Sequence, residues 1–546
     1  MRVFALVGAL VAGTVLAGAT TAAAAEDGGK VFPAPVGATP PVKWGIPCPA
    51  GTLSGVPADK LKEYSCGSYR MPIDHDNKYL GTIDIGLLKH SANTPDKKIG
   101  SLFLNPGGPG GAGRRMAISG TRFLQPSVVD KFDLIGFDPR GVGISNPLKC
   151  FTTQEDADEV FGAQIAVPIS RAEISGTLAA YRDYGQFCKN NAGALLNHMS
   201  TKDVVRDLDV LRAAVGDQKL TYVGFSYGTL IGSTYAAMFP KQSRAIVIDG
   251  NVDPQLRTSD GVQYDRERAT GFEIALDGFL KRCQQVGTNC AFSSGQPRAK
   301  FDELRTYLRS KPLTAPDGKP YTINNFTGDI SGALYDPGAF SGLAADLQYY
   351  YNAAFPPAGA QTQSLAGANL KVLNGSGSGR QDGRGDSPYT GDDSYFGVNC
   401  LDKQFKGVKQ DSVPAIAAKW EQESPTFGRY QAFSDTAGCP VWPAKKPDVY
   451  RGPWRAETDT PVLVIGNYYD PATQYKFAQR MTKQLGNARL LTVDAFGHCI
   501  LGDALGVDKA TAEYLVDLKV PAAGQVFQPN VQPFGTAAAA ASADKR

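Results

Sequence analysis

Short apolar runs alternate with amphipathic stretches through the first half of the chain. The segment 201–215 has apolar residues at helical spacing, and Thr201 is its expected N-cap. Runs with the apolar content of buried strands lie at 82–90, 101–104, 132–138, 221–223 and 244–249. Nearly all-apolar strands that alternate with helices indicate a parallel sheet covered on both faces. The pattern therefore predicts the α/β class.

The alternation stops near residue 255 and resumes near residue 455. The stretch between is helix-prone, and 264–281 is its clearest helix. Strand patterns return at 461–470 and at 489–498. We therefore predict one α/β domain whose sheet is interrupted by a largely helical cap.

The two ends of the chain differ in composition from the predicted domain. Residues 1–25 have a basic start, an apolar core and an Ala-x-Ala-type cleavage site near Ala25, which predicts a secretory signal. The apolar run is shorter than the roughly 20 residues of a membrane-spanning helix, and no other stretch is long enough, so we expect no membrane anchor. The predicted organisation is a signal at 1–25, an arm at 26–44, the domain at 45–254 and 455–520, the cap at 255–454, and a low-complexity tail at 521–546.

The segment Gly224-Phe-Ser226-Tyr-Gly228 lies between a predicted strand and a predicted helix. In a Gly-x-Ser-x-Gly turn, the two glycines let strand and helix approach closely, and the serine is held in a strained conformation with its hydroxyl exposed. Five such residues can also occur by chance in a glycine-rich chain, so the rest of the site decides between the two interpretations. Ser226 is the candidate nucleophile.

An acid and a base follow the two later strands. Asp470 is the last residue of the run 461–470, and His498 is the last residue of the run 489–498. The order Ser226, Asp470, His498 is that of an α/β-hydrolase triad, in which histidine takes the serine proton and the carboxylate orients the imidazole. The backbone N–H of Tyr227 and one N–H of the glycine-rich turn at 105–113 would form the oxyanion hole. In that turn Gly108 is the first candidate and Gly107 the second.

Charge and histidine content exclude several other classes of function. The 546 residues carry 56 Lys and Arg against 53 Asp and Glu, so the formal net charge is +3. This balance gives no reason to expect nucleic acid as a partner. The chain has four histidines and no Cys-x-x-Cys or His-x-x-x-His spacing, so we expect no metal site and no cofactor.

The nine cysteines of an exported chain are expected to form disulfides for the most part. Eight of them fall into near neighbours, and short loops favour local pairs, although eight cysteines allow 105 connectivities. The expected pairs are Cys48 with Cys66, Cys150 with Cys188, Cys283 with Cys290, and Cys400 with Cys439. Cys499 is left over and is expected to be a packed free thiol.

Asp138 and Arg140 lie in a glycine turn after the strand at 132–138. Charged residues beside a buried strand can be catalytic, but an ion pair that holds the turn is the favoured interpretation.

Taken in order, several motifs resemble one family. They are Asn105-Pro-Gly-Gly-Pro-Gly, Gly136-Phe-Asp-Pro-Arg-Gly-Val-Gly-Ile-Ser, Gly224-Phe-Ser-Tyr-Gly-Thr, Asp249-Gly-Asn-Val-Asp-Pro, Asn399-Cys-Leu-Asp, Asp470-Pro-Ala-Thr and Gly497-His. From about Cys48 to Leu515 the chain is similar to the secreted bacterial tripeptidyl aminopeptidases of the actinomycete type, which are α/β-hydrolases related to the proline iminopeptidases. Two departures, Gln474 and Cys499, stand where the family often has proline and glycine.

The resemblance implies a secreted serine exopeptidase, expected as a monomer, that releases short peptides, tripeptides among them, from the free N-termini of peptides or proteins. Such an enzyme must bind the substrate amine. Asp402 is a candidate for that role, and holding the hinge of the cap near Cys400 is its alternative role. Other activities on the same fold are those of a proline iminopeptidase-like aminopeptidase and of a small-ester esterase or lipase. A catalytically silent binding protein would usually lack a member of the triad.

Overall fold

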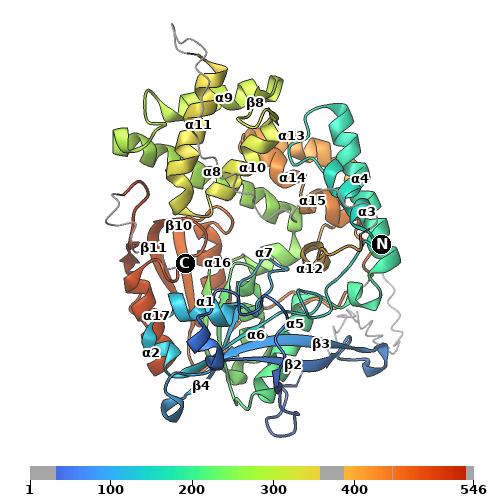
Figure 1. Ribbon diagram of the computed structural model, residues 1–546, viewed down its shortest axis with the longest axis vertical. Coiled ribbons are helices and arrows are strands. Elements are labelled where there is room, and N and C mark those ends of the chain that lie inside the picture. Colours follow the sequence, from blue (N-terminus) through green and yellow to red (C-terminus); the bar gives the residue numbers. More distant parts are fainter. Residues whose placement is uncertain (1–31, 357–386, 446, 536–546) are drawn as a thin grey trace, which may run out of the picture. The chain divides into compact units, whose positions relative to one another are not determined.

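A computed structural model of the chain describes residues 32–356, 387–445 and 447–535. The signal predicted at 1–25, the start of the arm and the last residues of the tail lie outside these ranges. A ten-stranded sheet, in the order β1-β2-β3-β5-β4-β6-β7-β10-β11-β12, organises the fold (Figure 1). Its strands are β1 (Lys43–Ile46), β2 (Tyr64–Pro72), β3 (Thr82–His90), β4 (Gly100–Asn105), β5 (Phe132–Phe137), β6 (Leu220–Phe225), β7 (Ser243–Asp249), β10 (Val462–Tyr469), β11 (Ala488–Phe496) and β12 (Val526–Phe527).

The sheet is mostly parallel, as the α/β prediction required. At one edge β1 pairs antiparallel with β2, β2 with β3, and β3 with β5. The remaining neighbours in the sheet, in the order β5-β4-β6-β7-β10-β11-β12, all pair parallel. Val223, Leu463 and Leu491, on three different parallel strands, are fully buried. Burial on both faces explains why these strands are nearly continuous apolar runs in the sequence.

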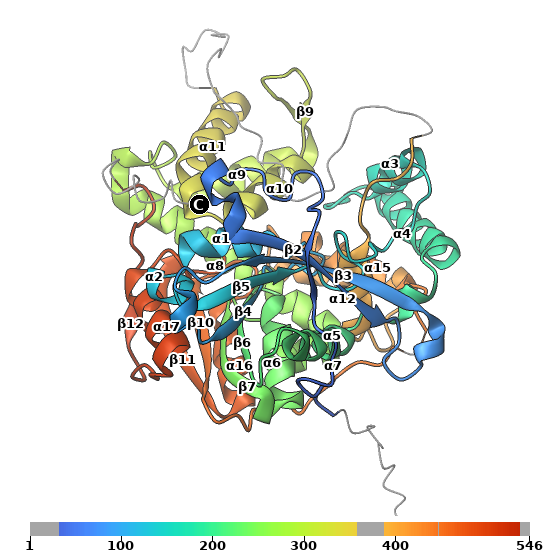
Figure 2. The same cartoon turned by 60° about the horizontal axis from the view of Figure 1, so that its bottom comes forward.

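Helices cover both faces of the sheet (Figure 2). On one face α5 packs against α6, α6 packs against β6 and β7, and α16 packs against β10 and β11. On the other face α1 and α2 pack against β5, and α17 packs against α2 and β7. These helices are α1 (Met116–Phe123), α2 (Pro126–Val129), α5 (Thr201–Ala214), α6 (Gly228–Met238), α16 (Tyr475–Leu485) and α17 (Leu505–Asp517).

A second body of helices follows β7 and has a core of its own. Phe272, Phe279, Phe301 and Phe326 are buried in that core, together with Leu304. Its elements are α7 (Pro254–Ser259), α8 (Gly261–Val286), α9 (Pro297–Ser310), α10 (Ile323–Ala333), α11 (Phe340–Ala354), α12 (Ser394–Asp402), α13 (Val413–Glu423), α14 (Gly428–Ala432), α15 (Asp435–Gly438) and the hairpin of β8 (Leu313–Thr314) with β9 (Pro320–Tyr321). Short 3-10 helices lie at Ala58–Glu63, Lys78–Leu80, Pro95–Lys97, Ala194–Asn197, Pro240–Gln242, Gly287–Asn289, Pro337–Ala339, Gln410–Ser412 and Cys439–Val441.

Two helices that precede the nucleophile strand belong with this helical body. They are α3 (Gln154–Ala163) and α4 (Arg171–Asn191), and they lie beside α13 and α15 in Figure 1. Leu178 and Tyr181 of α4 share a buried cluster with Trp420 of α13, and the Tyr181 hydroxyl donates to the carbonyl of Phe433 at 2.8 Å. The helical covering is therefore drawn from two separate stretches of the chain.

Both end segments are partly built into the α/β body. The backbone N–H of Ala34 donates to Asp209 on α5 at 2.6 Å, and that of Val42 donates to the carbonyl of Ala214 at 3.1 Å. At the other end, β12 adds a strand to the sheet edge beside β11. The described parts of the predicted arm and tail are thus packed against the domain.

Four disulfides join the near-neighbour cysteines: Cys48–Cys66, Cys150–Cys188, Cys283–Cys290 and Cys400–Cys439. Cys499 is free. None of the helices in the described part of the chain is long and apolar enough to cross a membrane.

Asp138 and Arg140 are structural, but they do not pair with each other. Asp138 accepts a hydrogen bond from the side chain of Arg114 at 2.8 Å. Arg140 is fully buried and makes a two-pronged ion pair with Asp207 of α5, at 2.6 and 2.7 Å. Both residues therefore form structural ion pairs, as expected, but with separate partners, Arg114 and Asp207, and not with each other.

Candidate active site

Ser226 follows β6 directly and has a left-handed backbone conformation, with φ of +54°. A Cβ atom on Gly224 would meet the carbonyl oxygen of Gly228 at 2.5 Å, and one on Gly228 would meet Oδ1 of Asn105 at 2.8 Å. Both positions therefore require glycine, because no side chain fits between strand and helix. The turn holds Ser226 at the N-terminal end of α6, where partial positive charge accumulates.

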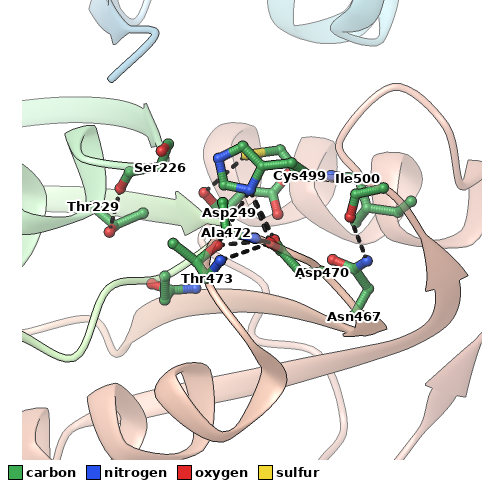
Figure 3. A network of polar contacts seen from close by, with 12 residues as sticks. Ser226, Thr229, Asp249, Asn467, Asp470, Ala472, Thr473, Cys499 and Ile500 are labelled. Carbon is green, nitrogen blue, oxygen red and sulfur yellow. Dashed lines mark hydrogen bonds and ion pairs between the residues drawn. The ribbon is translucent and has the colours of Figure 1, made fainter. Parts of the chain in front are cut away.

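His498 and Asp470 form a hydrogen-bonded pair. Nδ1 of His498 lies 3.0 Å from each carboxylate oxygen of Asp470. The carboxylate also accepts from the N–H of Ala472 at 3.0 Å, the N–H of Thr473 at 2.8 Å and the Thr473 hydroxyl at 2.9 Å (Figure 3). These donors stabilise the ionised acid, which can then fix the histidine as the tautomer protonated on Nδ1.

Ser226 and His498 line the same pocket of about 620 Å³. They reach it because β6, β10 and β11 run parallel, so their carboxyl ends meet at one edge of the sheet. Figure 3 shows Ser226 on one side of this edge and Asp470 and Thr473 on the other. Among the described residues, the Ser226 hydroxyl has no hydrogen-bond partner, and in hydrolases without substrate such bonds are often formed only in the complex.

The glycine-rich turn lies against the nucleophile turn. A Cβ atom on Gly107 would meet the carbonyl oxygen of Phe225 at 2.3 Å. The N–H of Gly107 donates to Oδ1 of Asn105 at 2.9 Å, whereas Gly108 and Tyr227 both line the pocket. The structure thus brings Gly108 and Tyr227 to the pocket with Ser226, and it uses the N–H of Gly107 within the turn.

Asp249, at the end of β7, links the two halves of this arrangement. Its carbonyl accepts from the N–H of Ser226 at 2.9 Å, and its Oδ2 accepts from the N–H groups of Ile500 and Leu501 at 2.7 and 2.8 Å. Complete burial raises the pKa of its carboxyl group to about 7. Sequence reasoning missed this role, although Asp249 ends the strand that lies between β6 and β10 in the sheet.

Asp402 is not among the residues that line the pocket. It is fully buried on α12, where Oδ1 accepts from the N–H of Thr201 at 2.9 Å and Oδ2 from the Thr201 hydroxyl at 2.6 Å. The carboxylate therefore joins a cap helix to the start of α5, which corresponds to the structural alternative for this residue.

The cap side of the pocket carries aromatic and charged groups that the sequence did not single out. Tyr335 packs edge-on against the His498 ring at 5.1 Å, and its carbonyl accepts from the N–H of His498 at 2.9 Å. Arg257, Arg268 and Asp392 supply the charged side chains of the pocket among the described residues. The regular spacing of Tyr264, Arg268 and Phe272 on α8 was the signal that could have found this face.

Comparisons with known proteins show the family to which the chain belongs. A family model described as "alpha/beta hydrolase fold" matches residues 100–308, and one described as "TAP-like protein" matches 424–526. The serine protease Hip1 of Mycobacterium tuberculosis (strain ATCC 25618 / H37Rv) is 30% identical over 505 residues, which cover 89% of this chain and 90% of that protein. The chain belongs to the TAP-like family of α/β-hydrolases.

Two further relatives show how the names within the family vary. The tripeptidyl aminopeptidase of Streptomyces lividans is 28% identical over 463 residues, covering 81% of this TAP-like hydrolase and 79% of the relative. Carboxylesterase B of Mycobacterium tuberculosis (strain ATCC 25618 / H37Rv) is 28% identical over 485 residues, covering 85% and 86%. The predicted family and fold are confirmed, and the TAP-like hydrolase is a serine hydrolase of the peptidase type.

Proposed function

We propose that the protein is a secreted serine exopeptidase that releases short peptides, tripeptides in particular, from free N-termini. One observation carries the proposal: a serine in a strained strand–helix turn and a histidine held by a buried carboxylate line one pocket. The predicted signal at 1–25 and the four disulfides support export. Peptide or protein N-termini would be the substrates of a monomeric enzyme.

In the proposed mechanism Ser226 forms an acyl-enzyme. Its Oγ attacks the scissile carbonyl carbon while Nε2 of His498 takes the hydroxyl proton, and Asp470 stabilises the imidazolium through Nδ1. The imidazolium then gives this proton to the leaving amine as the C–N bond breaks. A water molecule, deprotonated by the same histidine, hydrolyses the ester that remains.

The backbone N–H groups of Tyr227 and Gly108 would stabilise the tetrahedral oxyanion. Both residues line the pocket, and neither N–H has a hydrogen-bond partner among the described residues. The N–H of Gly107 already donates to Asn105, so Gly107 is the weaker candidate. Donors that are fixed before the reaction need no reorganisation as the charge develops, and this is the source of their catalytic effect.

An exopeptidase of this kind must also bind an ammonium group away from Ser226. Among the described residues that line the pocket, the only carboxylate is that of Asp392, which is exposed to solvent. Its two oxygens accept from the N–H groups of Ser394 and Gly143 at 2.8 and 2.9 Å, and each oxygen keeps a free lone pair. Asp392 therefore replaces Asp402 as the candidate for binding the amine.

A small-ester hydrolase is the second candidate function, favoured by the relative named carboxylesterase B. The triad and oxyanion hole would serve an ester as well as an amide. The two functions differ in the leaving group and in whether a free amine is required.

The test compares free and N-acetylated tripeptide anilides with short acyl esters, using the secreted protein. The exopeptidase releases intact tripeptides and loses most of its kcat/KM when the amine is acetylated. Ser226→Ala is the matched control, expected to lower kcat by several orders of magnitude because the triad acts as a unit. Ester turnover without amide cleavage would establish the second function, and equal rates on free and acetylated anilides would exclude the exopeptidase.

A further inference from the structure

One cation of the pocket wall lies on a regular helical face. Tyr264, Arg268 and Phe272 follow one another at four-residue intervals on α8, and all three line the pocket that contains Ser226. Residues spaced in this way share one side of a helix. The α8 helix therefore presents a guanidinium between two aromatic rings to the space where the substrate would bind.

Among the residues that the structure describes, the guanidinium of Arg268 has no hydrogen-bond or ion-pair partner, unlike its charged neighbours. The neighbouring cation Arg257 donates to Oδ1 of Asn399, and Lys403 pairs with both Asp265 and Asp435. In the described part of the chain, Arg268 makes no hydrogen bond and no ion pair. Its hydrogen-bond donors are therefore available to a bound molecule.

The acids closest to Arg268 do not reach the pocket. Asp265 accepts from Lys403 and from the Thr436 hydroxyl, and both Asp265 and Asp435 are buried. They act on Arg268 through their charge without contacting it. Asp392 also lines the pocket, but among the described residues it makes no ion pair with Arg268 and its oxygens accept from the N–H groups of Ser394 and Gly143. The pocket wall therefore offers an unpaired positive charge.

Arg268 also lies close to the reacting groups. Tyr335 and Tyr395 line the same pocket as Arg268. Tyr335 packs against the His498 ring, and a Cβ atom on Gly110 of the glycine turn would meet the N atom of Tyr395 at 3.1 Å. Arg268 therefore shares one pocket with a residue packed on the catalytic histidine and with one that lies against the glycine-rich turn.

We propose that Arg268 forms an anion subsite that binds a carboxylate of the substrate, namely an Asp or Glu side chain on the acyl side of the scissile bond. Guanidinium matches the planar carboxylate with two parallel hydrogen bonds, and a pocket wall of aromatic rings strengthens the pair by excluding water. A neutral amide makes weaker bonds at the same place. This inference rests on the proposed peptidase activity and specifies its substrate class.

The test uses tripeptide anilides that carry either Glu or Gln at one of the three positions. For the wild-type enzyme, kcat/KM at one position is expected to be roughly 10- to 100-fold higher for Glu, the range typical of hydrogen bonds to charged groups. Arg268→Gln should bring the Glu-to-Gln ratio close to one, and Arg268→Glu should favour a Lys substrate. A purely structural role for Arg268 would lower both rates and leave the ratio unchanged.

Arg266→Gln is the matched control on the same helix. Arg266 pairs with Glu423 outside the pocket, so this variant should keep the wild-type ratio. Thermal unfolding and labelling by a fluorophosphonate show whether each variant is folded and has an intact serine. The inference is wrong if the wild type shows no preference for Glu at any position, or if the preference survives Arg268→Gln.

The carboxylate could also come from the free C-terminus of a short peptide on the leaving side. Peptides with a C-terminal carboxylate or amide separate the two sources, and a preference for the carboxylate that is lost in Arg268→Gln would overturn the acyl-side assignment. A pair of 4-nitrophenyl esters, of glutaric acid and of its monoamide, tests the subsite without peptidase activity. An Arg268-dependent preference for the glutaric ester supports the subsite even if no anilide is cleaved, whereas equal ester rates contradict it.

Discussion

Asp402 accepts two hydrogen bonds from Thr201, one from its N–H at 2.9 Å and one from its hydroxyl at 2.6 Å. The same hydroxyl lies 2.6 Å from the hydroxyl of Tyr227, the residue after Ser226. Because the Thr201 hydrogen goes to the carboxylate, Tyr227 must be the donor to Thr201. A chain of hydrogen bonds therefore connects cap helix α12 to the side chain of Tyr227, whose backbone N–H is a predicted oxyanion donor.

Thr201→Val should loosen the side chain of Tyr227, and with it the position of the backbone N–H of this residue, while preserving the shape of the Thr201 side chain. The substitution removes the acceptor of the Tyr227 hydroxyl and one donor to buried Asp402, and we expect kcat to fall about 10-fold with little change in KM. Thr201→Ser, which keeps the hydroxyl, is the control and should retain most of the activity. A change in KM alone, measured on a cleaved anilide or ester, would show that the chain does not act on the oxyanion hole.

The sheet was largely predictable because burial on both faces leaves a continuous apolar run. The strand predicted at 82–90 is Thr82–His90 in the structure. The helix predicted at 201–215 begins where expected, but its N-cap is Ser200, which forms a capping box with Asp203. Two adjacent hydroxyl residues compete for the cap, and the sequence alone does not decide between them.

The site was predictable only where chain order carries the information. The two glycines of the Gly-x-Ser-x-Gly turn indicated Ser226. Asp470 and His498 were indicated by their positions at strand ends, because parallel strands place their carboxyl ends together. The roles of Asp402 and Arg268 depend on how helices from distant segments pack, and no local pattern gives that packing. The helix α4 illustrates the same limit, since its apolar face could equally have covered the sheet.

Asp249 should make the enzyme less stable as the pH rises from 4 to 7. Burial raises the pKa of its carboxyl to about 7 in the folded state, above its ordinary value of 3.8, so its contribution to stability is complete below pH 4 and is lost as pH rises through 7. The loss between these two pH values is on the order of 3 kcal/mol. Asp249→Asn, which can still accept from the two N–H groups, should remove this dependence.

Urea unfolding of both proteins at pH 4 and pH 7 measures the effect of Asp249. Other raised carboxyls, such as Asp346 and Asp393, contribute equally to both proteins and cancel in the comparison. The same change in unfolding free energy for wild type and variant would show that Asp249 does not titrate in this range.

The disulfides should differ in their effect on stability according to the loops they close. Cys400–Cys439 spans 39 residues and Cys283–Cys290 spans 7. If disulfides act mainly by restricting the unfolded chain, replacing the first pair by serines should cost about 1.5 kcal/mol more than replacing the second. Thermal unfolding of the two double variants tests the order, and peptide mapping without reduction should find Cys499 as the free thiol. A larger loss for the short loop would contradict the loop-entropy explanation.

Asp392→Asn should weaken the binding of substrates that carry a free amine. Asp392 contributes a carboxylate to the pocket, and an uncharged amide attracts an ammonium group much less strongly. The two oxygens of Asp392 accept from different backbone N–H groups, those of Ser394 and Gly143, so the asparagine keeps one of these two hydrogen bonds. We expect KM for free tripeptide anilides to rise roughly 10-fold with a smaller change in kcat, since the contact is made equally in the ground and transition states. The N-acetylated anilide or a short acyl ester supplies the internal control, because neither has an ammonium group for Asp392 to bind.

An equal loss of activity on free and blocked substrates would mean that Asp392 supports the fold of the pocket rim, and the amine would then have to be bound by the tyrosine hydroxyls and amide oxygens of the cap.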